Sequence, residues 1–141
     1  MKSNIQLKYR NYVVFSHFYG CAVNNLGVIM ILHDYETSSG RNVIKEYIDS
    51  LTIPEMVDGY SVREKMENGE FEKLNIKRWE KKIYEVYFYK HNRIFYIIPD
   101  GDNIYLLHAC RKQKNKTEKG DSKIIKKRAK ELGKALGKKF I

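Results

Sequence analysis

Apolar residues recur along the chain with two periods, and the change of period separates a helical part from a strand-rich part. Residues 28–32 form a short apolar run, which predicts a buried strand. Asp34 or the hydroxyl groups of residues 37–39 are candidates to cap a following helix. Apolar side chains then recur every three or four residues over 43–51 and, more weakly, over 56–66. We therefore expect a strand followed by a helical hairpin.

The second half contains three short runs of apolar and aromatic residues separated by turn-forming residues: 83–89, 93–98 and 103–110. Successive short hairpins favour an antiparallel sheet. A last helix, which Asp121 or Ser122 can cap, carries its apolar residues on one face: Ile125, Ala129, Leu132 and Leu136. The order of elements predicts an α+β fold, with a helical hairpin packed on a small antiparallel sheet and a C-terminal basic helix.

Charge is distributed unevenly along the chain, whose net charge is +10. Residues 1–110 carry 14 basic and 14 acidic side chains, whereas residues 111–141 carry 13 basic and 3 acidic ones. A basic end attached to a neutral body indicates a polyanionic partner such as nucleic acid. The alternative is a basic helix that is simply solvated.

The patterns of cysteine, histidine and hydropathy exclude several classes of protein. Cys21 and Cys110 lie in separate apolar runs, with neither a CxxC motif nor a Cys/His ligand spacing. We therefore expect no metal site, no disulfide, no cofactor and a reducing, cytoplasmic environment. The longest apolar stretch, residues 12–32, is broken by His17 and two asparagines, so neither a membrane span nor a signal peptide is expected.

Several short motifs occur in order between residues 30 and 136: ENG at 67–69, YEVY at 84–87, RIFY at 93–96, LLHAC at 106–110, KQKNKT at 112–117 and KRA at 127–129. Together they resemble the RelE/ParE superfamily of toxin–antitoxin toxins, and most closely its phage-derived HigB-like branch. Tyr87 stands where that branch usually has arginine. Since such toxins begin almost at their first strand, we expect a toxin domain over residues 30–141. Residues 1–29 are then an N-terminal extension outside the native core, or alternatively an added edge strand or helix.

The resemblance implies the toxin of a type II toxin–antitoxin system that cleaves mRNA on the ribosome in the cytoplasm. The 2′-hydroxyl of the RNA attacks the adjacent phosphate in such an endoribonuclease. Its partners are then the ribosome, the mRNA and a cognate antitoxin, which in this branch is often a helix-turn-helix protein. Two alternatives stay open, namely a non-enzymatic ParE-like inhibitor of DNA gyrase and an inactive basic RNA-binding domain.

Cleavage of this kind needs fixed cations at the phosphate and groups that move protons. We expect Arg93 and Lys112 to bind the phosphate, because a guanidinium offers a planar fork of donors to its oxygens. An ion pair between Arg93 and Glu85 is the alternative. Glu85 is a candidate base, unless it only orients Arg93, and His108 has a suitable pKa, unless it is a buried, hydrogen-bonded residue.

A second group of residues is predicted to bind RNA without taking part in the reaction: Tyr87, Lys114, Lys116, Lys123, Lys127 and Arg128. Tyr87 either stacks on an unpaired base or fills the edge of the core. The cations are expected to contact phosphates, which positions RNA without reading its sequence.

Overall fold

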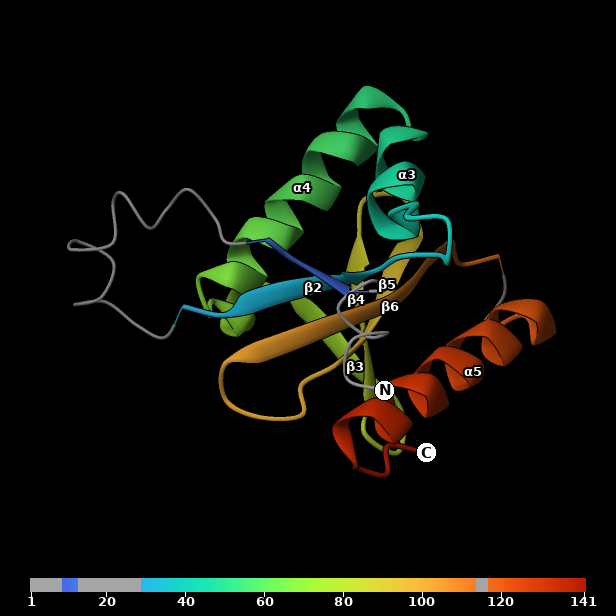
Figure 1. The fold of residues 1–141 in the computed structure, drawn as a ribbon. Helices are drawn as coiled ribbons and strands as arrows, with labels where there is room; N and C mark the ends of the chain where they lie inside the picture. The colour runs from blue at the N-terminus through green and yellow to red at the C-terminus, as the bar shows by residue number, and fades with distance from the viewer. Residues whose placement is uncertain (1–8, 13–28, 114–116) are drawn as a thin grey trace.

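One mixed sheet separates two helical layers in the computed structural model, which describes residues 9–12, 29–113 and 117–141. Helices α3 and α4 cover one face of the sheet, and α5 covers the other (Figure 1). The sheet has the strand order β1-β2-β6-β5-β4-β3. Its strands are β1 (Tyr9–Tyr12), β2 (Ile31–Tyr35), β3 (Asn75–Glu80), β4 (Ile83–Phe88), β5 (Asn92–Ile97) and β6 (Asn103–Arg111). The predicted α+β class is confirmed.

The prediction of a wholly antiparallel sheet is wrong at one pair of strands. Strand β2 runs parallel to β6, whereas every other pair of neighbouring strands in the described sheet is antiparallel. A parallel pair needs a long connection. The helical hairpin and three further strands lie between β2 and β6, and they supply that length.

The first predicted strand, residues 28–32, lies three residues too early compared with β2. The cause is a buried polar residue that the hydropathy pattern cannot recognise. Asp34 is 0% exposed, and its carboxylate accepts hydrogen bonds from both terminal nitrogens of Arg63, at 2.6 and 2.9 Å. A buried charge is tolerated when it is paired in this way. The cap prediction is also wrong, because Asn42 caps α3 by accepting a hydrogen bond from the Lys45 backbone N–H at 3.0 Å.

The helical hairpin is confirmed, and it consists of α3 (Val43–Asp49) and α4 (Ile53–Glu67). Gly59, which interrupts the apolar pattern of α4, lies where the helix meets its neighbours. A Cβ atom at this position would lie 3.0 Å from Phe88 and 3.1 Å from Ile48. The missing side chain therefore lets α4 approach both β4 and α3 closely.

Strand β3 was not predicted, because its sequence NIKRWE is mostly polar and it forms an edge of the sheet. It follows a short 3-10 helix, η2 (Phe71–Lys73). Strands β4, β5 and β6 are confirmed to within a residue or two of the predicted ranges. The turn between β4 and β5 lies at residues 89–91, and both Lys90 and His91 have a positive φ.

Helix α5 (Lys119–Leu136) buries Ile125, Ala129 and Leu132, as its apolar pattern predicted. The predicted caps are wrong, since the helix begins before them and its N-cap position is Glu118. After α5 the chain turns back at Gly137, which has a φ of 66°, and buries Phe140 against the sheet side of the helix. None of the described helices is long and apolar enough to cross a membrane.

The described part of the N-terminal segment is β1, which pairs antiparallel with β2 at the edge of the sheet. These four residues fit the edge-strand alternative for residues 1–29. The other residues before position 29 lie outside the described residues, and the division into an extension and a toxin domain stays a prediction.

Candidate functional site

The predicted catalytic residues lie together on the face of the sheet that α5 covers. We call this the α5 face. Tyr87 on β4 pairs with Arg93 on β5, and Arg93 pairs with Cys110 on β6. Residues two apart on a strand share a face. Glu85 therefore lies beside Tyr87, and Lys112 follows Cys110 on the same side. The register places Arg93 and Lys112 on one face of the molecule, as a shared anion site requires.

Arg93 is the most unusual residue of this face, because its side chain is only 2% exposed. Its Nη1 donates to the Glu85 carboxylate at 3.2 Å, and the guanidinium lies 5.2 Å from the centre of the Phe95 ring. Its Nε and Nη2 donate to no acceptor in the described part of the chain. Buried donors without a partner are uncommon and costly. The Glu85 pair suggested by the sequence is therefore present, and it leaves two donors of Arg93 unused.

Arg93 is one of the residues that line a cavity of about 330 Å³ between β3, β4, β5 and the start of α5, while its Nε and Nη2 atoms are themselves buried. Its lining residues are Lys77, Arg78, Trp79, Glu85, Arg93, Thr117 and Ser122. Three of the seven are cationic, and one is acidic. We call this cavity the Arg93 cavity. Its size, positive lining and unused donors suit an anion such as phosphate.

Tyr87 connects Glu85 with Lys112. Its hydroxyl donates to the Glu85 oxygen that does not face Arg93, and Lys112 Nζ lies 5.2 Å from the centre of its ring. Burial, followed by the hydrogen bond to Glu85, raises the pKa of Tyr87 to about 12, so the phenol keeps its proton at neutral pH. The Lys112 backbone N–H donates to the His91 carbonyl oxygen at 2.5 Å, which fixes the start of the lysine-rich loop.

His108 is mostly buried and lies between two charged side chains. Its Nε2 lies 2.7 Å from an oxygen of Asp121, at the start of α5, and its Nδ1 lies 3.4 Å from Arg128 Nη1. Burial lowers the pKa of His108 from its usual value of 6.5, so the ring is neutral at pH 7. This environment fits the alternative of a buried, hydrogen-bonded histidine, and a role in proton transfer stays a prediction.

Among the described residues, one group of three side chains has the spacing of metal ligands. The ligand atoms of His108, Cys110 and Asp121 all lie within 4.8 Å of one another. Their surroundings are unfavourable for a cation, because Arg93 and Arg128 lie close enough to His108 to lower its pKa electrostatically. Burial also raises the pKa of the Cys110 thiol to about 12, which disfavours the thiolate that a metal needs. We therefore assign this group to the positioning of His108.

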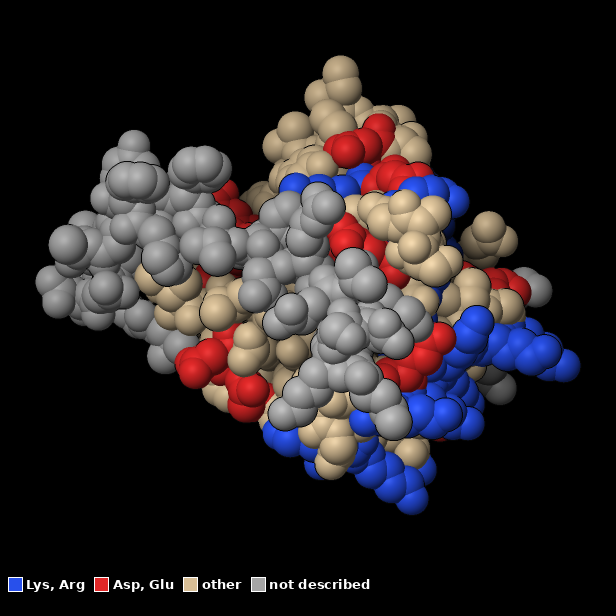
Figure 2. All heavy atoms as spheres, viewed as in Figure 1, with Lys and Arg blue, Asp and Glu red and all other residues tan. Residues whose placement is uncertain are grey.

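The predicted RNA-binding cations differ in their placement. Lys123 and Lys127 are exposed on α5, and the space-filling view shows lysine and arginine gathered over this helix (Figure 2). Arg128 instead points inward, donating to the Leu107 carbonyl oxygen at 2.8 Å and lying 4.1 Å from the centre of the Tyr35 ring. Lys114 and Lys116 lie outside the described residues.

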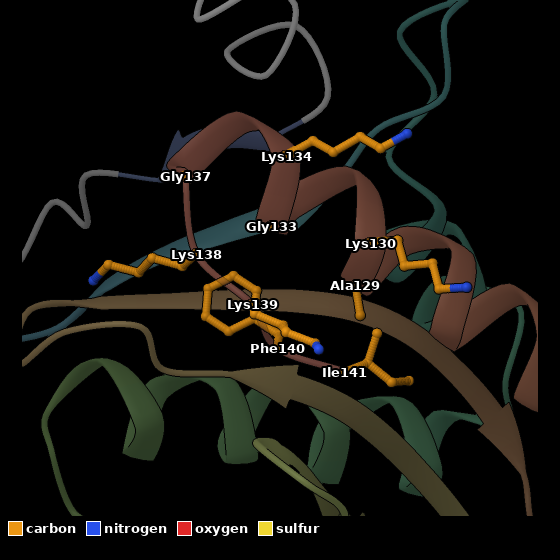
Figure 3. A pocket seen from close by; sticks show the side chains of 9 residues that line it. All are labelled: Ala129, Lys130, Gly133, Lys134, Gly137, Lys138, Lys139, Phe140 and Ile141. Atoms are coloured by element: carbon orange, nitrogen blue, oxygen red, sulfur yellow. The ribbon is translucent and has the colours of Figure 1, made fainter.

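A separate cavity of about 410 Å³ lies between the end of α5 and the C-terminal segment. The side chains of Lys130, Lys134 and Lys138 extend away from it, while Phe140 and Ile141 lie nearer Ala129 (Figure 3). This cavity shares no lining residue with the Arg93 cavity. Its lysines add to the positive surface of α5.

Sequence reasoning missed the part of the site that β3 contributes. Lys77 pairs with Glu85 across the two strands, and Arg78 and Trp79 follow it along the Arg93 cavity. The KRW triplet is a weak signal, since a basic pair beside an aromatic residue suits nucleic acid but is common on surfaces. Only the strand register shows that it borders the predicted site.

The sequence profile of the family described as phage-derived protein Gp49-like (DUF891) matches residues 46–130. The chain belongs to this family. The Gp49-like family is associated with RelE-like toxins. The matched residues contain β3, β4, β5, β6 and more than half of α5, and therefore every residue that lines the Arg93 cavity of this Gp49-like protein. A comparison with curated proteins found no match to the chain.

Proposed function

We propose that this Gp49-like protein is the toxin of a type II toxin–antitoxin system, of the HigB-like branch, and a ribosome-dependent mRNA endoribonuclease. The observation that carries the proposal is that Arg93, two of whose nitrogens have no acceptor among the described residues, lines a cavity together with two further cations. A phosphate group supplies acceptors for both donors. Fixed donors that need no reorganisation are the largest catalytic contribution in many enzymes.

The reaction is an internal phosphoryl transfer within the RNA. The 2′-oxygen forms a bond to the adjacent phosphorus, and the bond from phosphorus to the 5′-oxygen breaks. The products are a 2′,3′-cyclic phosphate and a free 5′-hydroxyl group. One proton leaves the 2′-hydroxyl and one reaches the departing 5′-oxygen, so the site needs an acceptor and a donor of protons as well as cations.

In this proposal Arg93 binds the phosphate oxygens through Nε and Nη2, while Glu85 holds its third nitrogen in place. Glu85 accepts the proton of the 2′-hydroxyl through the Tyr87 hydroxyl, which already donates to it. Tyr87 gives its proton to Glu85 as it receives the other, so it never has to ionise. Lys112 supplies charge and a proton on the side of the leaving oxygen, and His108 positions the start of α5.

The basic surface of α5 is proposed to contact ribosomal RNA. Lys123, Lys127 and the lysines of the C-terminal turns supply charges that hold the protein on phosphates and do not select a sequence. A cognate antitoxin that covers the Arg93 cavity and the basic surface of α5 with acidic side chains would block both cleavage and the contact with ribosomal RNA, since complementary charge speeds and orients association.

Controlled expression in bacteria tests the proposal. We expect the wild-type chain to arrest growth and to produce cuts in a reporter mRNA, mapped by primer extension, only while that mRNA is translated. Arg93→Gln and Lys112→Ala are expected to relieve the arrest, whereas Lys82→Ala, a change of an exposed lysine in the β3–β4 turn, is the matched control and is expected to arrest growth. Circular dichroism verifies that each variant is folded.

Other outcomes would favour the alternatives. Intact mRNA together with double-strand breaks in DNA would indicate inhibition of gyrase. Growth that continues at high levels of the folded wild-type chain would indicate a basic RNA-binding domain without toxicity. Equal arrest by the wild type and by both site variants would reject the assignment of the site.

A further inference from the structure

A third cavity, of about 670 Å³, lies at the hairpin end of β4 and β5, next to the Arg93 cavity. Lys77 lines both cavities, so they adjoin across the outer part of the α5 face. Tyr87 and Lys112, which line this third cavity, have catalytic roles in the proposal above, whereas its other lining residues have none. We call it the hairpin cavity.

The lining of the hairpin cavity combines aromatic rings with positive charge. Tyr87, Tyr89 and His91 supply rings, and Lys77, Lys90 and Lys112 supply ammonium groups. None of its described lining residues is acidic. Flat apolar surfaces alternating with cations are what a single-stranded nucleotide requires, since the base stacks and the phosphate is neutralised.

Tyr89 is the ring that is free to stack. It is 53% exposed, whereas the Tyr87 ring already has the Lys112 ammonium group over it. The exposed phenol ring therefore offers a flat surface on which an unpaired base can stack.

The backbone of Tyr89 is held at both its N–H and its carbonyl group. The Tyr89 backbone N–H donates to the Asp58 carboxylate of α4 at 2.5 Å, and the Tyr89 carbonyl accepts from the Asn92 side chain at 2.5 Å. The Lys90 and His91 backbones have φ values of 63° and 68°, which non-glycine residues seldom adopt. A turn anchored in this way presents its side chains as a fixed surface, which lowers the entropy lost when a base stacks.

We propose that the hairpin cavity binds the base of the nucleotide adjacent to the scissile phosphate, with Tyr89 as the stacking surface and Lys90 on the neighbouring phosphate. This inference rests on the proposed function, because the Arg93 cavity places the phosphate next to it. It makes Tyr89 a specificity-determining residue. The ribosome presents the codon, and the hairpin cavity adds a modest preference among bases through the strength of their stacking.

The test uses the purified full chain and a 2′-O-methyl hexaribonucleotide that carries 2-aminopurine and resists cleavage. Binding is followed by fluorescence anisotropy, and stacking by quenching of the 2-aminopurine. We expect Tyr89→Leu to weaken binding about ten-fold and to remove the quenching, as the loss of one stacked base predicts. Tyr89→Phe keeps the ring and is expected to bind like the wild type.

Tyr84→Leu is the matched control, because Tyr84 is an exposed tyrosine of β4, 38% exposed, on the opposite face of the sheet. It is expected to leave affinity and quenching unchanged. Equal binding by Tyr89→Leu and the wild type would overturn the proposal. So would displacement of the oligonucleotide by polyglutamate with no dependence on the Tyr89 ring, which would assign the cavity to an acidic protein partner.

Primer extension on the reporter mRNA, in the expression assay described above, separates this inference from the proposed function. If Tyr89→Leu changes the positions of the cuts but Arg93→Gln abolishes them, both proposals are supported. Unchanged cut positions in Tyr89→Leu, with cleavage still dependent on Arg93, would reject the base site alone. Binding that depends on Tyr89 without any cleavage by the wild type would reject the nuclease and keep a single-stranded RNA site.

Discussion

The buried pair of Arg93 and Glu85 should reduce the stability of the free protein, and this expectation can be measured. The two side chains are 2% and 4% exposed and share one hydrogen bond of 3.2 Å. Each unpaired buried donor of Arg93 costs about 1–3 kcal/mol. Replacement of a buried ion pair by apolar residues of similar volume is neutral or stabilising by about 1–4 kcal/mol. We expect the double variant Glu85→Met, Arg93→Met to gain about 2 kcal/mol, because Tyr87 is half-buried and water can replace its lost acceptor.

Thermal and urea unfolding at pH 7 measure this change. A gain of about 2 kcal/mol raises Tm by roughly 4–8 °C in a chain of this size. The single variant Glu85→Met leaves a buried cation without its partner and should lose about 3–5 kcal/mol. Inorganic phosphate at ten times its Kd should stabilise the wild type by about 1.4 kcal/mol and the double variant by nothing.

The reasoning fails if the double variant is destabilised by about 2 kcal/mol or more, because the pair would then hold the fold together. It also fails if phosphate stabilises the wild type and the double variant equally. In that case the anion would bind elsewhere, for example on the lysines of α5.

Three further predictions concern the stability of the fold outside the candidate site. Arg63→Met leaves the fully buried Asp34 carboxylate without its bidentate partner and should lose about 3–5 kcal/mol in urea unfolding. Gly133→Ala places a Cβ atom 2.5 Å from a backbone carbonyl oxygen of the C-terminal segment and should destabilise the protein by more than about 1 kcal/mol. Gly120→Ala, in open space on the same helix, should stabilise it by about 0.5–1 kcal/mol. Equal Tm shifts for the two variants would contradict the observed chain reversal. Burial raises the pKa of Glu67 from 4.5 to about 7, so the folded state loses stability as the pH rises through that interval. Glu67→Gln should therefore equal the wild type at pH 4 and exceed its free energy of unfolding at pH 8 by about 3 kcal/mol, and parallel pH profiles would refute this.

The elements that follow one hydrophobic period could be predicted from the sequence. Helix α5 buries Ile125, Ala129 and Leu132 as its spacing requires, and β4, β5 and β6 alternate or run apolar within the predicted ranges. The strand β2 could not be placed correctly, because Asp34 reads as a polar boundary until its partner Arg63, on another element, is known. Strand β3 was also missed because its stability depends on another element. An edge strand is stabilised by its neighbour more than by its own apolar residues.

The candidate site was predicted as a set of residue types, and the structure supplies their relation. The sequence identified Arg93, Lys112, Glu85 and His108, and the strand register places all four on the α5 face. Whether Arg93 pairs with Glu85 or binds a phosphate was posed as an alternative. The geometry allows both at once, because the ion pair uses one nitrogen and leaves two donors free. The sequence could not reveal this arrangement, because no sequence pattern shows that an arginine side chain is buried.

The central claim is that the cations of the α5 face bind a phosphate while the RNA chain breaks there. The most direct measurement uses a reconstituted translation system, a defined mRNA, the purified chain and its Arg93→Gln variant, with the RNA ends analysed chemically. We expect fragments that end in a 2′,3′-cyclic phosphate and begin with a 5′-hydroxyl, formed only with ribosomes present and only by the wild type. Intact mRNA in the presence of the folded wild-type chain and translating ribosomes, or identical fragments from the variant, would contradict this claim.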